Sequence, residues 1–132
     1  MLGDLIYEAT GKVIGTRVLD ENGTMEITLQ EQGMLFGSEC TVTLTVVSKL
    51  GSNGILYSEG YGVLLTKDGD TATCTLSGIT ISKELTSLSC IRGAAFCRTQ
   101  SQKLARLNSV VCIYEAETND DVSYNLKGWE WK

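Results

Sequence analysis

The sequence predicts an all-β protein folded as a closed eight-stranded antiparallel barrel with up-and-down topology. Turn-forming clusters recur roughly every dozen residues, and the runs between them are dense in Thr, Val, Ile, Leu and Tyr. Polar and apolar residues alternate along several of these runs, as in strands with two unlike faces. Since no helical segment is long enough to cover a sheet, the strands must bury each other. Closing them into a barrel also removes exposed edges.

Glycine-containing clusters mark the predicted turns. Asn22-Gly23 predicts a first hairpin because such turns need positive φ angles. Gly51-Ser52-Asn53-Gly54 and Lys67-Asp68-Gly69-Asp70 predict two more, with softer breaks near Gln32-Gly33, Lys83-Glu84 and Thr118-Asn119-Asp120-Asp121. The strands are then expected at about 4–19, 24–32, 35–49, 55–66, 70–82, 86–99, 108–117 and 122–131.

Alternation is clearest in the third run, where Thr41, Thr43 and Thr45 interleave with Val42, Leu44 and Val46. It recurs over 71–78, where Thr and Ser alternate with smaller or apolar residues. Residues 101–107 are the helical candidate, about one turn long. Glycines inside the predicted strands are expected to mark bends or bulges, or else to make room for a ligand.

The composition and net charge of the chain limit which molecules it can bind. The 132 residues predict one domain, 1–132, with 42% hydrophobic residues, 20% charged residues and a net charge of −5. No window is basic enough to neutralise phosphates, so neither nucleic acid nor an anionic membrane is expected as a partner. No apolar run approaches ~18 residues, and Met1-Leu2-Gly3-Asp4 lacks the features of a secretory signal. A cytoplasmic location follows as an expectation.

Five cysteines and the absence of histidine limit the chemistry further. The cysteines never form Cys-x-x-Cys, so no metal site is predicted and no cofactor is expected. Free thiols in a reducing compartment are the favoured interpretation, with a secreted form carrying one disulfide as the alternative. Cys97, beside Arg98, is the one plausible nucleophilic cysteine.

Several motifs resemble one protein family. They are Gly15-Thr16-Arg17-Val18-Leu19, Leu56-Tyr57-Ser58-Glu59-Gly60-Tyr61-Gly62, Lys67-Asp68-Gly69, Arg92-Gly93, Lys103-Leu104-Ala105-Arg106-Leu107-Asn108 and the closing Trp129-Glu130-Trp131-Lys132. In order and spacing the chain is similar to small bacterial and archaeal proteins of the allene oxide cyclase barrel-like group. The resemblance implies the barrel fold. Other members of this broader fold bind apolar, conjugated molecules and steer their cyclisation or coupling.

Glu59 is the leading candidate for a catalytic acid or base. It shares a strand face with Tyr57 and Tyr61, which are expected to contact a ligand. A carboxylate among aromatics needs a partner if it is buried, and Arg92, flanked by apolar residues, is the expected one. Both charges are predicted to face the barrel lumen from nearby strands.

The remaining candidate ligand-binding residues repeat this pattern of acids beside apolar or aromatic residues. They are Glu115, Glu130 and the flanking Trp129 and Trp131. One arginine with two or three glutamates could hold a proton at raised pKa, or could form a structural ion-pair network. The aromatic residues could likewise be packing residues and not ligand contacts.

The sequence thus predicts a barrel that binds a small lipophilic molecule in its lumen. As an enzyme it would be a cofactor-independent cyclase or isomerase of a conjugated or polyketide-like substrate, acting through shape and one carboxylate. The alternative is a non-enzymatic structural or binding module with a packed barrel core that forms a homo-oligomer. Cavity volume and the direction of the Glu59 face distinguish the two.

Overall fold

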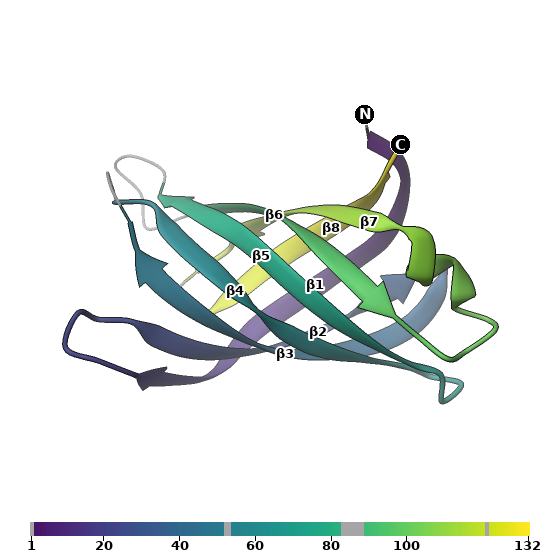
Figure 1. Cartoon of the computed structure of the whole chain (residues 1–132), viewed down its shortest axis with the longest axis horizontal. Coiled ribbons are helices and arrows are strands. Elements are labelled where there is room, and N and C mark those ends of the chain that lie inside the picture. Colours follow the sequence, from purple (N-terminus) through teal and green to yellow (C-terminus); the bar gives the residue numbers. More distant parts are fainter. Residues whose placement is uncertain (1, 52–53, 83–88, 121) are drawn as a thin grey trace.

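The computed structural model describes residues 2–51, 54–82, 89–120 and 122–132. Within these residues, eight strands and the short 3-10 helix η2 follow one another along the chain (Figure 1). Their bounds are β1 Leu2–Val18, β2 Met25–Leu35, β3 Ser38–Leu50, β4 Leu56–Thr66, β5 Thr71–Ser82, β6 Ser89–Arg98, η2 Ala105–Ser109, β7 Val111–Thr118 and β8 Ser123–Trp131.

The strands form a closed antiparallel barrel in the order β1-β2-β3-β4-β5-β6-β7-β8, which confirms the predicted fold. Each strand pairs with the next along the chain, and β8 returns to pair with β1. The register of this last pair shifts between Leu2 and Tyr7, and β1 shifts again against β2 between Val13 and Gly15. Such irregularities bend a long strand around a small barrel.

The alternation predicted for the third run separates the inside of the barrel from its outside. Val42, Leu44 and Val46 are buried and face the lumen, whereas Thr43 on the same strand is exposed. The same two-residue period continues across β4, where Leu64 is buried and Leu65 is half exposed. Along both strands, side chains that face the lumen therefore alternate with side chains that face outward.

Positive φ angles occur at the predicted turns. Gly23 has φ 81° and Gly69 has φ 94°, values that glycine adopts without strain. The break expected near Gln32-Gly33 is wrong, because β2 continues through it to Leu35. The chain turns instead at Phe36 and Gly37, with φ 49° and 78°. The break near Lys83-Glu84 lies outside the described residues, as do Ser52, Asn53 and Asp121 of two other expected turns.

The connection between β6 and β7 closes one end of the barrel. It contains η2, which replaces the helical turn expected over 101–107. Leu104 and Leu107 are each 3% exposed and pack into the core with residues of β2, β3, β4 and β5. This cap lies at the same end as the two termini (Figure 1).

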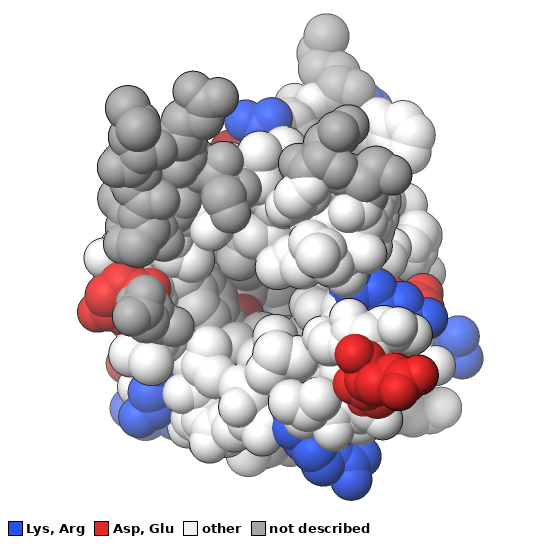
Figure 2. Space-filling view, turned by 90° about the vertical axis from the view of Figure 1, so that its left-hand side faces the viewer, with Lys and Arg blue, Asp and Glu red and all other residues white. Residues whose placement is uncertain are grey.

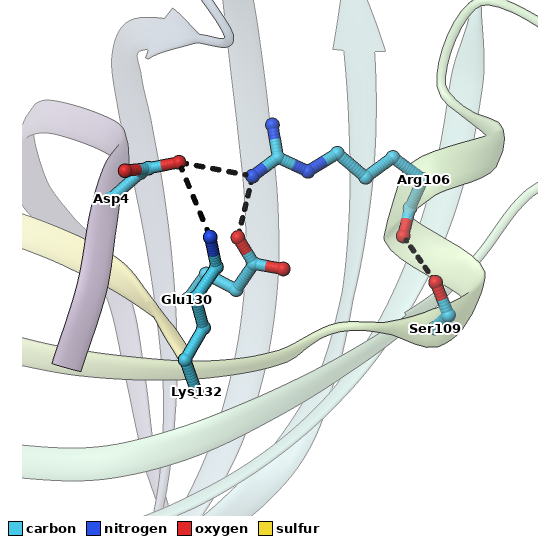
Figure 3. Close-up of polar contacts among 5 residues, drawn as sticks. All are labelled: Asp4, Arg106, Ser109, Glu130 and Lys132. Carbon is cyan, nitrogen blue, oxygen red and sulfur yellow. Dashed lines mark hydrogen bonds and ion pairs between the residues drawn. The ribbon is translucent and has the colours of Figure 1, made fainter. Parts of the chain in front are cut away.

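Arg106 of the cap is held by charged groups from both terminal strands (Figure 3). Its Nη2 lies 2.5 Å from Glu130 Oε2 on β8 and 3.5 Å from Asp4 Oδ2 on β1. The guanidinium also stacks on Phe36, 4.9 Å from the ring centroid. Arg106 thereby ties the cap to the β1–β8 seam and to the β2–β3 turn.

Strand glycines make room for two lumenal tyrosines. A Cβ on Gly11 would lie 2.5 Å from the Tyr124 hydroxyl oxygen, so the Tyr124 ring packs directly against the Gly11 backbone. Likewise, a Cβ on Gly93 would lie 2.5 Å from Tyr114 Cζ, and one on Gly78 would lie 2.6 Å from the Tyr114 hydroxyl oxygen. Strand glycines were expected either to mark bends or to make room for a ligand. At Gly11, Gly78 and Gly93 the space is instead filled by the two tyrosine side chains.

We predict that Gly11→Ala destabilises the protein by about 1–3 kcal/mol, because the added methyl collides with the buried Tyr124 ring. Gly15→Ala is the matched control on the same strand, since a methyl group at Gly15 would meet no other atom within 4 Å. Urea unfolding of both variants measures the difference. Equal stabilities would contradict the packing of Tyr124 over Gly11.

Candidate functional site

A cavity of about 400 Å³ occupies the barrel lumen. Apolar side chains from around the barrel supply most of its wall, among them Ile27, Leu29, Leu44, Leu64, Leu76, Ile91 and Leu126. At the end opposite the cap the surface is hollowed, with largely uncharged walls and an acidic surface at depth (Figure 2). The described residues thus close the lumen at the capped end and leave a hollow at the other.

Glu31 is the buried acid of this cavity. It lies on the inward face of β2 with Ile27 and Leu29, and it is only 4% exposed. The Tyr7 hydroxyl donates to Glu31 Oε1 at 2.8 Å, and the Tyr124 hydroxyl donates to Oε2 at 2.6 Å. Each carboxylate oxygen therefore has a donor, as a buried acid requires.

Three adjacent strands bring this cluster together across the seam of the barrel. Gly11 on β1 pairs with Glu31 on β2 and with Tyr124 on β8. Because Gly11 has no side chain, the Tyr124 ring crosses above it to reach the carboxyl of Glu31. The glycine is the local feature of the sequence that permits this contact.

Burial controls the protonation of the cluster. It raises the pKa of Glu31 above its ordinary value of 4.5, although the hydrogen bonds from Tyr124 and Tyr7 oppose the shift. Burial and the adjacent Glu31 also raise the pKa of Tyr7 and of Tyr124 far above the usual tyrosine value. Both tyrosines therefore remain hydroxyl donors, and Glu31 is the group of the three that loses its proton first as pH rises.

Tyr114 presents a free hydroxyl to the same cavity. It is 8% exposed and lines the lumen from β7. No residue in the described parts of the chain hydrogen-bonds its hydroxyl group. Burial, with a contribution from Glu31, raises the pKa of Tyr114 to about 12, so it too remains protonated. A hydroxyl that faces a cavity without a protein partner is suited to a polar group on a ligand.

Three thiols also lie on the inner wall. Cys74, Cys97 and Cys112 lie on β5, β6 and β7 and line the cavity. The Sγ atoms of Cys74 and Cys97 are 2.7 Å apart. Within the described ranges, no group of three or more His, Cys, Asp or Glu side chains is arranged to hold a metal ion.

Small polar side chains surround the open end. Ser48 and Ser58 hydrogen-bond to each other across β3 and β4. Asp120 Oδ1 accepts the backbone N–H groups of Val122 and Ser123 at 2.9 and 2.8 Å. These side chains place hydrogen-bonding groups at the described part of the entrance.

The prediction that Glu59 and Arg92 face the lumen is wrong. Both are exposed on the outer face, since β4 turns Ser58 inward and Glu59 outward. Arg92 lies 3.8 Å from Glu115 on the neighbouring strand, and both side chains are more than half exposed. Without a place in the lumen, neither Glu59 nor Arg92 can transfer a proton to a ligand bound there.

The other predicted ligand residues also lie away from the cavity. Tyr57 and Tyr61 are 52% and 74% exposed on the outer face of β4. None of the predicted ligand-binding set lines the lumen: Tyr57, Tyr61, Glu115, Trp129, Glu130 and Trp131. Tyr57, Glu59 and Arg92 do meet, but in a shallow groove on the outer face of the barrel.

Glu31 was missed by the sequence analysis, although its signal is present. Residues two apart in a strand face the same side, so Glu31 lies on one face of β2 together with Ile27, Leu29 and Leu35. It is thus a charged residue on an otherwise apolar strand face. The predicted strand ended at Gln32, so Glu31 was placed at a strand end and not in the middle of an apolar strand face. The two tyrosines that reach Glu31 come from β1 and β8, whose pairing depends on barrel closure.

Two solved structures share this fold over nearly their whole length. A conserved protein of unknown function from Rhodopseudomonas palustris aligns with a TM-score of 0.80 and 13% identity, covering 99% of each chain. A protein of unknown function from Clostridium acetobutylicum ATCC 824 aligns with a TM-score of 0.82 and 10% identity, covering 97% of this chain and 95% of its own. At these identities the likeness establishes the fold alone.

No protein-family model matches the chain, and no curated protein sequence matches it either. Among the described residues, no helix has the length and hydropathy needed to cross a membrane.

Glu31 makes a pH-dependent contribution to stability whose sign follows from its raised pKa. The folded protein keeps the Glu31 proton to higher pH than the unfolded chain does. The contribution is therefore fully present below the ordinary value of 4.5 and is lost as pH rises toward the folded-state pKa. Glu31→Gln should remove this loss, so its stability relative to wild type should rise with pH by up to about 1.4 kcal/mol per unit.

Urea unfolding at a series of pH values above 4 measures this difference, with Glu59→Gln as the exposed control that removes the same charge. The Glu59 variant should parallel the wild type. If Glu31→Gln also parallels the wild type at every pH, Glu31 is not a buried acid with raised pKa.

Proposed function

We propose that the protein binds a small, uncharged lipophilic molecule in the barrel lumen. The supporting observation is the cavity of about 400 Å³, within the ~300–1,000 Å³ usual for ligand pockets. Its wall is mostly apolar, and its few polar groups lie at defined positions. This combination favours a ligand with an apolar body and one polar group.

The charge of the cavity restricts the ligand class. Within the described residues, no lysine or arginine lines the lumen, and the buried ionisable acid is Glu31. A carboxylate ligand would lose its hydration and find no cation to replace it, which is costly. A neutral alcohol, ketone or phenol can instead hydrogen-bond to the free Tyr114 hydroxyl.

Displacement of N-phenyl-1-naphthylamine, a neutral fluorophore, tests binding and ligand class together. Dodecan-1-ol should displace it at least tenfold more effectively than dodecanoate at pH 8, because the chains match and the head groups differ in charge. Ala95→Trp should abolish fluorophore binding by filling the lumen. Ala94→Trp, its neighbour on the outer face of β6, is the matched control.

Binding that survives Ala95→Trp unchanged would place the ligand outside the lumen. Preference for dodecanoate would contradict the uncharged ligand class while leaving lumenal binding intact.

Proton-transfer catalysis is the second candidate function, and Glu31 supports it. In its ionised form, a buried carboxylate whose pKa is raised is a stronger base, so it can take a proton from carbon beside a carbonyl group and, as the acid so formed, return it to another carbon. The free Tyr114 hydroxyl can donate to the carbonyl oxygen as it gains negative charge. The chain would then act as a cofactor-independent isomerase or cyclase of a conjugated substrate, in keeping with its resemblance to the allene oxide cyclase barrel-like group.

Isomerisation of cyclohex-3-en-1-one to its conjugated isomer provides a test with a defined probe. Wild-type protein should accelerate the reaction, Glu31→Gln should abolish the acceleration, and Tyr114→Phe should reduce it by about 10²-fold. Ultraviolet absorbance of the conjugated enone follows the rate. An unchanged rate in Glu31→Gln would exclude Glu31 as the proton carrier.

The packed-core alternative is not favoured, because the lumen contains a cavity. Self-association stays a prediction. Its support is the exposed row Tyr57, Tyr61, Val63 and Leu65 on the outer face of β4, and it would leave the lumen free.

A further inference from the structure

Cys74 and Cys97 are directly opposite each other on paired strands. Cys74 on β5 is the register partner of Cys97 on β6. Directly opposed residues of antiparallel strands have Cα atoms about 4.5–5.5 Å apart, within the range that a disulfide can bridge. Their Sγ atoms are 2.7 Å apart, about 0.7 Å more than a disulfide bond. Small side-chain rotations could therefore join them without moving the strands.

The pair also contacts the cavity, so a molecule in the lumen can reach it. Both residues line the cavity wall and are half-buried. Apolar side chains lie nearby on the same strand faces, including Leu76 and Ala95. A lipophilic reagent would therefore be favoured at this site over a charged one.

The two thiols are electrostatically unequal. The hydrogen bond from Cys74 lowers the pKa of Cys97, despite the opposing effect of burial. The same hydrogen bond, together with burial, raises the pKa of Cys74 far above the usual thiol value. Cys97 is therefore the more readily ionised thiol of the pair and the better suited to act as nucleophile.

We propose that Cys74 and Cys97 form a dithiol site that reduces an uncharged organic hydroperoxide entering the lumen. This activity needs the cavity but neither the lumenal ligand nor Glu31. It also differs from the isomerase chemistry, since it is a two-electron redox reaction of the chain's own sulfurs.

The reaction has two steps. Cys97 gives up its proton, its thiolate attacks the terminal oxygen of the hydroperoxide, the O–O bond breaks, and the leaving alkoxide takes up the proton that Cys97 released and becomes an alcohol. Cys97 is then a sulfenic acid. The sulfur of Cys74 attacks the sulfur of Cys97, and hydroxide leaves with the Cys74 proton as water. The dithiol is oxidised to a disulfide while one hydroperoxide is reduced to one alcohol and one water.

The other cysteines are poorly placed to replace this pair. Cys112 pairs with Ala95, so it is a diagonal neighbour of Cys97, at about 7–8 Å by strand geometry. That separation exceeds the ~7 Å limit for bridging without backbone movement. Burial also raises the pKa of Cys112 to about 12 and that of Cys40 to about 11, so neither thiol ionises readily.

Tryptic peptide mapping can identify which cysteines form the disulfide, because trypsin leaves each of the five cysteines on a different peptide. Cleavage after Lys and Arg gives peptides 18–49, 68–83, 84–92, 93–98 and 107–127, each with one cysteine. Reduced protein is treated with one equivalent of cumene hydroperoxide, alkylated, digested and analysed by mass spectrometry. The alcohol product is measured by chromatography.

We expect peptides 68–83 and 93–98 to become disulfide-linked, free thiols to fall from five to three, and one equivalent of alcohol to form. Cys97→Ser should abolish alcohol formation. Cys74→Ser should still reduce the peroxide but stop at a sulfenic acid that dimedone traps on peptide 93–98. Cys90→Ser, on the outer face of the same strand as Cys97, is the matched control and should behave as wild type.

Different outcomes would overturn the proposal. These are linkage of any other peptide pair, alcohol formation that survives Cys97→Ser, or no oxidation under conditions where the folded protein is intact by circular dichroism. A Cys74→Ser protein that accumulates no trapped sulfenic acid would overturn the order of the two steps.

Discussion

The buried carboxyl of Glu31 is the interaction on which the organisation of the lumen depends. An acid in an apolar interior must be paired or protonated, and no lysine or arginine reaches it within the described chain. Its donors, Tyr7 and Tyr124, come from β1 and β8, the two strands that close the barrel. The hydrogen bond from Tyr124 to Glu31 therefore forms only when the β1–β8 seam is closed, whereas the one from Tyr7 joins the neighbouring strands β1 and β2. Arg106 joins the same two strands at the capped end, so polar contacts cross the seam at two levels.

Glycine and tyrosine together set the shape of the cavity. Tyr124 and Tyr114 lie over positions where any side chain would collide with them, and these positions are glycine. The rings thereby pack along the wall and leave the centre of the lumen open, with apolar side chains from β2, β3, β4 and β5 around it. The capped end is filled by Leu104 and Leu107. The molecule thus has a packed base and an open, mostly apolar cavity above it.

Local patterns predicted the fold, because turn glycines and the alternation of β3 are visible within a few residues of sequence. These local patterns did not predict which residues line the cavity. Glu59 and Arg92 were chosen as lone charges in apolar or glycine-rich segments. Successive residues of a strand face opposite sides of the sheet, and both residues lie on the side that faces away from the lumen. Glu31, in contrast, is a charged residue on the inward face of its strand. Its hydrogen-bond partners, Tyr7 and Tyr124, lie 24 and 93 residues away in sequence. Only closure of the barrel brings those three side chains together.

The titration of Glu31 itself tests this account most directly. Carbon-13 NMR of the side-chain carboxyl groups, with Glu31→Gln used to assign the signal, reports its protonation residue by residue. We expect a midpoint clearly above the ordinary value of 4.5, because burial outweighs the two tyrosine hydrogen bonds. A midpoint at or below 4.5 would mean that hydrogen bonds or hydration outweigh burial at Glu31, and would contradict a lumen organised around a buried acid with a raised pKa.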